Sequence, residues 1–279
     1  MTKTESTENI KLPSGIKPLE ELTLMDDYMF GAVMRNKENL KPLLESILNI
    51  RVMDIIFVEP QKSEKEGYLS HGIRMDLYVE DDSGRIFNVE VQTSDKRNLP
   101  KRMRYYQSVI DVDILSPGMD YIDLKKSYVI FICNYDPYHQ NRYIYTFENR
   151  CLEDTKLIFG DETQKVIVNT QGTVGEIHQE LKELLLYMNK GEATGNYTRQ
   201  LDKAVNLVKS SEERRHEYMV MKIHEMETRA EGRAEGIRDK TVEDARAMYD
   251  DGLELERIAR ILKLELSEVE VILGLRKMA

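Results

Sequence analysis

The sequence has 279 residues, of which 41% are hydrophobic and 32% charged, and its formal net charge is −10. This length suggests one domain with an extension, or two small domains. Two cysteines are too few for a disulfide framework or a zinc site and fit a reducing cytoplasm. No stretch is apolar enough to span a bilayer, and the polar start lacks the apolar segment of a signal peptide, so we expect a cytoplasmic protein without a membrane partner. The acidic charge argues against sequence-independent coating of nucleic acid but allows a local basic groove.

The first two thirds of the chain mix helical and strand patterns. A polar leader covers residues 1–18. Apolar spacing predicts helices over 22–33 and 40–48, with Asn39 as the N-cap of the second so that Pro42 falls in its first turn. Further helices are predicted over 100–111 and 174–188, and strands over 52–58, 72–80, 85–92, 128–133, 143–147, 156–159 and 165–169.

Beyond residue 195 the strand patterns stop. We therefore predict an α/β domain over 19–195, a charged helical extension over 196–240 with a hinge at 231–236, and a small helix-turn-helix-like tail over 241–279. The last helix begins Ser-Glu-Val-Glu at 267–270, without the Arg, Lys, Asn or Gln that a DNA-reading helix presents there. This favours a homo-oligomer formed through the C-terminal helices over DNA reading.

Two predicted strands carry an acidic pattern. Because strand side chains alternate, Glu90 and Gln92 share the face opposite the apolar row of their strand, and Asp76 is likewise out of phase with its apolar neighbours. A three-residue loop at 82–84, with Gly84 in the left-handed conformation, would place Asp76 opposite Glu90. A loop of two or four residues would instead oppose Asp76 to Val89.

Two adjacent carboxylates repel each other unless a cation lies between them. Oxygen ligands favour Mg²⁺ or Mn²⁺, which can activate a water molecule and stabilise charge developing on phosphorus. Gln92 could orient the water or a phosphate oxygen, but it lacks the positive charge of a lysine. The alternative interpretation is that Asp76 and Glu90 are surface residues on a solvated sheet face.

A basic segment follows the acidic strand directly. It holds five cations between residues 96 and 104, and this is the place where a phosphate backbone could dock. The alternative is a solvated charged surface. The candidate nucleic-acid-binding residues are Lys96, Arg97, Lys101, Arg102 and Arg104.

The order of these motifs resembles the PD-(D/E)XK nuclease superfamily. More narrowly, it resembles the recombination-promoting nuclease family, also described as PD-(D/E)XK nuclease family transposases. The likeness runs from about residue 20 to 240. It rests on the segments DDYMF (26–30), GIRMDLYV (72–79), NVEVQ (88–92), LPKRMRYYQ (99–107), YVIFIC (128–133), YTFEN (145–149) and YM (218–219).

The resemblance implies a restriction-endonuclease-like α/β core, a mixed sheet flanked by helices, with a helical C-terminal extension. It also implies metal-dependent cleavage of DNA, in recombination or transposition, with Asp76 and Glu90 as Mg²⁺ or Mn²⁺ ligands. Gln92 stands at the position of the superfamily's catalytic lysine. Glu45 and Gln107 are candidate accessory residues.

Two other functions remain open on these residues. One is a catalytically weak or inert nucleic-acid-binding or regulatory protein on the same fold, which the neutral Gln92 and the acidic charge favour. The other is an interaction module acting through the helical tail. The paired Asp76 and Glu90 favour the nuclease.

Overall fold

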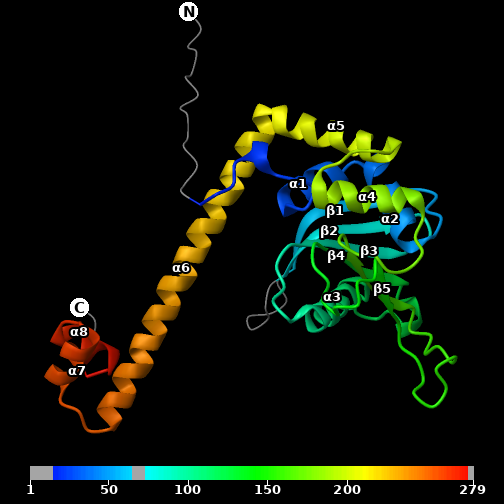
Figure 1. Ribbon diagram of the computed structural model, residues 1–279. Helices are drawn as coiled ribbons and strands as arrows, with labels where there is room; N and C mark the ends of the chain where they lie inside the picture. Colours follow the sequence, from blue (N-terminus) through cyan, green and yellow to red (C-terminus); the bar gives the residue numbers. More distant parts are fainter. Residues whose placement is uncertain (1–14, 65–72, 276–279) are drawn as a thin grey trace, which may run out of the picture. The chain divides into compact units, whose positions relative to one another are not determined.

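The computed structural model describes residues 15–64 and 73–275 (Figure 1). The expected leader therefore lies largely outside the described residues. One compact unit is Lys17–Arg215, and another contains the chain from His216 onward. Each is described below by itself.

The unit Lys17–Arg215 is built on a six-stranded mixed sheet with the order β1-β2-β3-β4-β6-β5. The first three strands are antiparallel neighbours, β4 and β6 continue parallel to β3, and β5 is antiparallel at the edge. The strands are β1 (Ile55–Glu64), β2 (Ile73–Asp81), β3 (Ile86–Gln92), β4 (Ser127–Cys133), β5 (Ile144–Phe147) and β6 (Thr163–Asn169).

Helices cover both faces of this sheet (Figure 1). One face is covered by α3 (Leu99–Ile114). Short 3-10 turns also occur in the chain, at Leu19–Glu21 and Tyr121–Asp123. All seven residues of β4 are buried, as expected for a parallel strand between two helical layers. The predicted restriction-endonuclease-like core is thus confirmed. The helices of the other face are α1 (Asp27–Met34), α2 (Lys37–Leu48), α4 (Gln179–Lys190) and α5 (Asn196–Ser210).

Helix α2 begins earlier than its sequence pattern predicted. Asn36, not Asn39, is the N-cap, and its side chain accepts a hydrogen bond from the backbone N–H of Glu38 at 3.0 Å. Pro42 consequently lies in the second turn and cannot donate to the Glu38 carbonyl, its i−4 partner. The Gln200 amide donates to that carbonyl at 3.3 Å instead, so α5 supplies a bond that the helix lacks.

The strand predicted over 156–159 is wrong. This segment contributes only an isolated bridge between Arg150 and Ile158. Its apolar side chains are exposed, with Phe159 at 75%, so no sheet face is there to bury them. The helix predicted from residue 174 begins at Gln179, and it ends as expected at Gly191, which has a φ of 76°.

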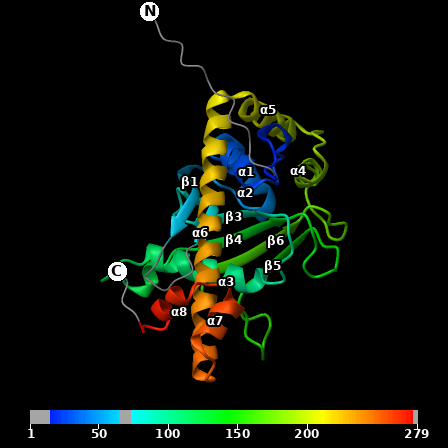
Figure 2. The same ribbon diagram turned by 90° about the vertical axis from the view of Figure 1, so that its left-hand side faces the viewer.

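In the second unit, α6 (Glu212–Asp250) continues without interruption through 231–236. The hinge predicted there is therefore wrong, because a glycine within a helix costs only about 1 kcal/mol and the flanking residues are good helix formers. As predicted, the tail has two short helices, α7 (Leu255–Leu262) and α8 (Leu266–Ile272), which pack against the end of α6 (Figure 2). Their small core centres on Ala245, Ile258 and Val269.

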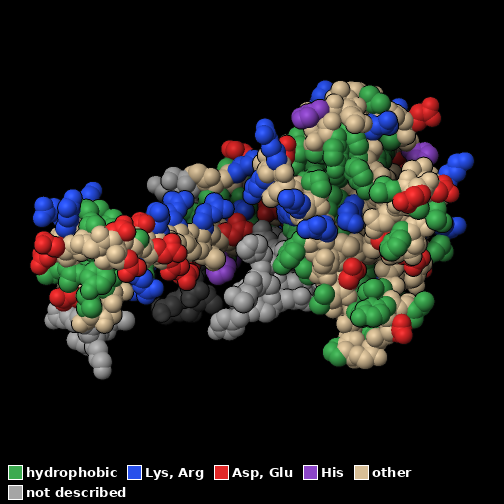
Figure 3. Space-filling model, turned by 90° about the horizontal axis from the view of Figure 1, so that it is seen from below, with side chains coloured by type: hydrophobic (Ala, Val, Ile, Leu, Met, Phe, Trp, Pro, Cys, Tyr) green, Lys and Arg blue, Asp and Glu red, His purple; other side chains and the backbone are tan. Residues whose placement is uncertain are grey.

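Basic and acidic side chains alternate over the surface of these C-terminal helices (Figure 3). The face in view carries no broad surface of a single charge there. Within residues 15–64 and 73–275, every helix falls short of the length or the apolar character that crossing a bilayer requires.

Candidate active site

The hairpin of β2 and β3 sets the position of the acidic residues. The strands pair from Leu77 opposite Val89 to Glu80 opposite Ile86. The Asp81 N–H donates to the Arg85 carbonyl at 3.1 Å, which closes a three-residue loop. Gly84 in this loop has a φ of +74°. The predicted loop length and register are confirmed, and the register continues to Asp76 opposite Glu90.

Each of the two carboxylates accepts a hydrogen bond from the backbone of the opposite strand. The Asp76 N–H donates to Glu90 Oε1 at 2.9 Å, and the Val91 N–H donates to Asp76 Oδ2 at 3.1 Å. Glu90 is 1% exposed and Asp76 is 8% exposed. The interpretation of this pair as residues on a solvated face is therefore wrong, because α3 covers that face of the sheet.

The electrostatics of the pair follow from its burial. Loss of solvent, together with the nearby charge of Asp76, raises the pKa of Glu90 well above its usual range. The hydrogen bond from the Asp76 N–H and the charge of Arg102 oppose this rise without cancelling it. The site therefore stabilises bound positive charge more than a single carboxylate would.

Arg102 reaches this pair from α3. Its Nη2 donates to Glu90 Oε2 at 3.1 Å, and its Nη1 donates to Gln92 Oε1 at 2.5 Å. Nη2 also donates to the Tyr106 hydroxyl at 2.6 Å, and the guanidinium lies 5.0 Å from the ring centroids of both Tyr106 and Phe131. Arg102 is one of the predicted nucleic-acid contacts, and unlike the other cations of its segment it directs its guanidinium to Glu90 and Gln92 while its side chain stays 34% exposed.

Gln92 ends β3 at the margin of the site. Its Oε1 accepts from Arg102, and its Nε2 donates to the Ser94 carbonyl at 2.8 Å. Both ends of the amide are therefore oriented. A pocket of about 450 Å³ lies beyond the ends of β3 and β4, where Thr93 and Asn134 contribute to its wall.

Neither predicted accessory residue joins the carboxylate pair. Glu45 lies on α2, on the other face of the sheet from α3, and its Oε1 accepts from the Val52 N–H at 2.9 Å. Gln107 Nε2 donates to Ser127 Oγ at 2.7 Å. Ser127 begins β4, whereas Phe131, beside Glu90, lies four residues further on, roughly 13 Å at 3.3 Å per residue. Gln107 is simply too far along the strand to reach the site.

The other basic residues remain on the surface. Lys96 and Arg97 are exposed in the connection from β3 to α3, and Lys101 and Arg104 are exposed on the first turns of α3. These four residues follow Gln92 along the chain, and Lys101 and Arg104 are neighbours of Arg102 on α3. We call the four residues the cationic segment.

Sequence reasoning missed two neighbours of Glu90. The Tyr106 hydroxyl lies 3.5 Å from Glu90 Oε2, and the apolar stripe of Leu99, Met103 and Ile110 could have indicated that Arg102 and Tyr106 border the buried face of α3. Asn88 is fully buried two residues before Glu90, and its amide forms no hydrogen bond of good geometry with the described residues. Its proximity still favours the ionised form of Glu90.

The donors that suit a hard divalent cation here are the two carboxylates and the amide oxygen of Gln92. The described part of the chain holds no group of three or more His, Cys, Asp and Glu residues arranged to hold a metal ion. A cation at this site would thus depend on two carboxylates and complete its shell with water or phosphate, as Mg²⁺ does.

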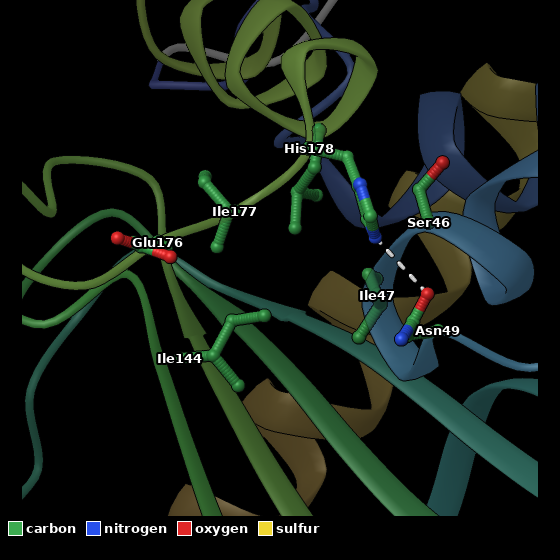
Figure 4. A pocket seen from close by; sticks show the side chains of 8 residues that line it. Ser46, Ile47, Asn49, Ile144, Glu176, Ile177 and His178 are labelled. Carbon is green, nitrogen blue, oxygen red and sulfur yellow. Dashed lines mark hydrogen bonds between the residues drawn. The ribbon is translucent and has the colours of Figure 1, made fainter.

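A separate pocket of about 390 Å³ lies between the end of α2 and the segment before α4 (Figure 4). Ile47, Ile144 and Ile177 give it an apolar wall, and His178 Nε2 lies 3.0 Å from Asn49 Oδ1 at its rim. The predicted site residues do not line it.

We compared the chain with protein families, curated proteins and solved structures. No curated protein and no solved structure matched the chain. Residues 25–252 match the family described as PD-(D/E)XK nuclease family transposase. This range includes Asp76, Glu90, Gln92 and all of α3, and it ends before α7. The chain belongs to the PD-(D/E)XK nuclease family transposases.

Proposed function

We propose that this protein is a DNA endonuclease of recombination or transposition that depends on Mg²⁺ or Mn²⁺ held by Asp76 and Glu90. The observation that carries the proposal is the pairing of two buried carboxylates. Asp76 and Glu90 lie opposite each other on neighbouring strands, and each accepts a backbone hydrogen bond from the other strand. Two adjacent carboxylates repel each other and a bound cation relieves this repulsion, so such a pair is a candidate site for a cation.

The residues of the chain have distinct roles in this proposal. A bound divalent cation supplies an activated water and stabilises charge on the phosphorus. Asp76 and Glu90 hold the cation, and the backbone bonds to their carboxylates keep the two side chains side by side. Gln92, oriented at both ends of its amide, places a polar group beside the reacting phosphate.

DNA is proposed to dock along the cationic segment. Lys96, Arg97, Lys101 and Arg104 are exposed there, and the N-terminus of α3 adds the partial positive charge of a helix dipole. Cations that contact phosphate position a duplex without reading its sequence. The overall charge of −10 does not oppose this, because the cations are concentrated beside the site.

Nicking of plasmid DNA tests the proposal. Supercoiled plasmid is incubated with Mg²⁺ or Mn²⁺ and either the full chain, Asp76→Ala, Glu90→Ala or the control Asp82→Ala, an exposed residue of the hairpin loop. We expect nicking by the full chain and by the control, and a rate lower by about a hundredfold or more in the two site variants, since metal catalysis contributes several kcal/mol. Equal nicking by Asp76→Ala and the unaltered chain would refute the proposal.

The second candidate is a non-catalytic nucleic-acid-binding protein, and the neutral Gln92 at the lysine position favours it. Binding of labelled DNA by the full chain, without nicking in either metal, would support this candidate. Self-association through α7 and α8 stays a prediction, which light scattering on the full chain at several concentrations can test.

A further inference from the structure

We propose that Arg102 is the catalytic cation of this site and provides, from α3, the positive charge that Gln92 lacks. The inference rests on the proposed function, since it assigns a role within the same cleavage site. Its starting point is one observation: a single guanidinium bridges Glu90 Oε2 and Gln92 Oε1, at 3.1 and 2.5 Å.

Aromatic rings and hydrogen-bond acceptors fix the position of the Arg102 guanidinium. The guanidinium lies over the rings of Tyr106 and Phe131, which stack on each other with centroids 5.7 Å apart. The Tyr106 hydroxyl accepts from Nη2, and from Nε at 3.1 Å. Two rings and three oxygen acceptors therefore hold one planar cation, an arrangement that suits the rigid fork of arginine better than the point charge of lysine.

Arg102 differs in this from the other cations of its segment. Lys101 and Arg104, its neighbours on α3, point to solvent, whereas the Arg102 side chain is 34% exposed and paired with a carboxylate that is 1% exposed. The exposed part of the guanidinium can still meet a ligand that arrives from solvent. A residue with a purely structural role would gain nothing from that opening.

Charge compensation explains why a cation is needed at this position. A divalent ion held between the two ionised carboxylates would cancel their charges, and Arg102 would then add one positive charge to the site. That added charge matches a phosphodiester, which carries one negative charge. Without Arg102, the site would hold one positive charge fewer to attract the additional negative charge of the transition state.

The same geometry gives Arg102 a second partner during the reaction. If Glu90 held a cation, an N–H of Arg102 Nη2 would be available to donate to a non-bridging phosphate oxygen. Nη1 remains on Gln92, so the amide directs the fork toward the phosphate. Arg102 donates hydrogen bonds in this role and transfers no proton, because its pKa is too high for deprotonation.

In the variant Arg102→Gln we expect the affinity for Mn²⁺ to rise and the rate of DNA cleavage to fall. Removing the guanidinium leaves the carboxylates with more net negative charge, so Mn²⁺ should bind about tenfold more tightly, by Coulomb attraction near a surface. Single-turnover cleavage of DNA should fall by about a hundredfold or more, the usual loss for one donor to a developing anion. Arg102→Lys, which keeps the charge without the fork, should recover part of the rate.

The experiment measures Mn²⁺ binding by calorimetry without DNA, cleavage in a single turnover, and the melting temperature. The control is Arg199→Gln, an exposed arginine on α5 over the other face of the sheet, which should change none of them. Tighter Mn²⁺ binding with slower cleavage supports the inference. Arg102→Lys keeps the test valid if Arg102→Gln fails to fold.

The opposing outcomes separate this inference from the function on which it rests. If the unaltered chain nicks DNA and Arg102→Gln nicks it equally fast, the inference fails and the proposed function stands. If Arg102→Gln loses Mn²⁺ binding and cleavage together with a lower melting temperature, Arg102 is structural and the inference fails. If the unaltered chain neither binds Mn²⁺ nor nicks DNA, the proposed function fails first.

Discussion

The two ends of the β2–β3 hairpin each bury an acidic residue beside an arginine, but they balance the charge differently. At the loop end, Asp81 is fully buried, its Oδ1 accepts from the Ser83 and Arg85 N–H groups, and its Oδ2 accepts from Arg85 Nε at 2.7 Å. At the open end, Glu90 pairs with Arg102 at 3.1 Å, and a second buried carboxylate, Asp76, lies opposite Glu90.

This difference distinguishes a locally paired charge from the proposed metal site. At the loop end the acid and its partners lie within five residues, and one guanidinium compensates one carboxylate. At the open end the arginine comes from another element, and two buried carboxylates lie next to each other. Two buried carboxylates that repel each other are where a cation is expected.

The largest expected effect is on stability at the loop end. Asp81→Ala leaves Arg85 and two backbone N–H groups without their acceptor, so we expect the free energy of unfolding to fall by about 3–5 kcal/mol. Urea denaturation measures this, with the exposed neighbour Asp82→Ala as the control. A loss no larger than that of the control would show that the loop end is not a structural charge pair.

At the open end, the expected change in stability has the opposite sign. Asp76→Asn removes the repulsion with Glu90 and leaves Glu90 paired with Arg102, so the metal-free protein should gain about 1 kcal/mol of unfolding free energy while nicking is lost. Thermal melting in a chelator measures the gain, and Asp82→Asn is the control. A lower melting temperature would contradict a net repulsion between Asp76 and Glu90.

A fourth carboxylate, Asp136, extends the comparison to pH. Burial raises its pKa, but hydrogen bonds from the Tyr145 hydroxyl and from the Tyr138 and Asn141 N–H groups outweigh this and hold the pKa below its ordinary value of 3.8. A depressed pKa means that the carboxylate stabilises the fold above that value and loses this contribution as the pH falls through its folded-state pKa.

We therefore expect Asp136→Asn to cost about 1 kcal/mol at pH 7, a modest value because the residue is partly solvated. The difference from the unaltered chain should shrink as the pH falls below 3.8. Denaturation curves across that range measure it. A difference that does not depend on pH would contradict a role for the ionised form.

The smallest expected effect concerns the cationic segment. Lys96→Gln and Lys101→Gln should each reduce the slope of log affinity for DNA against log salt by about 0.9, because each contact releases one counterion. Fluorescence anisotropy at several salt concentrations measures this, with exposed Lys203→Gln on α5 as the control. Slopes equal to that of the control would place the DNA elsewhere.

The hairpin shows how far local sequence determines this protein. The turn residues at 82–84 permit the three-residue loop that places Asp76 opposite Glu90, and both the turn and the alternation depend on neighbours in the chain. The structure excludes the loops of two or four residues that the sequence left open. Contiguous apolar stripes likewise predicted most helices. The start of α2 was misjudged because Gln200, from a distant helix, satisfies the carbonyl that Pro42 leaves open.

By itself, the sequence located the strands that form the sheet, apart from one wrongly predicted over 156–159, because strands follow from periodicity. Its turn chemistry also permitted the hairpin register that brings two carboxylates together. Only the tertiary structure decided that α3 buries that face, that Arg102 turns inward and that Gln107 lies too far along β4. Burial and charge pairing depend on which elements pack together, and residues distant in the chain make those contacts. The burial of the two carboxylates and the pairing of Glu90 with Arg102 are therefore properties of the packed molecule.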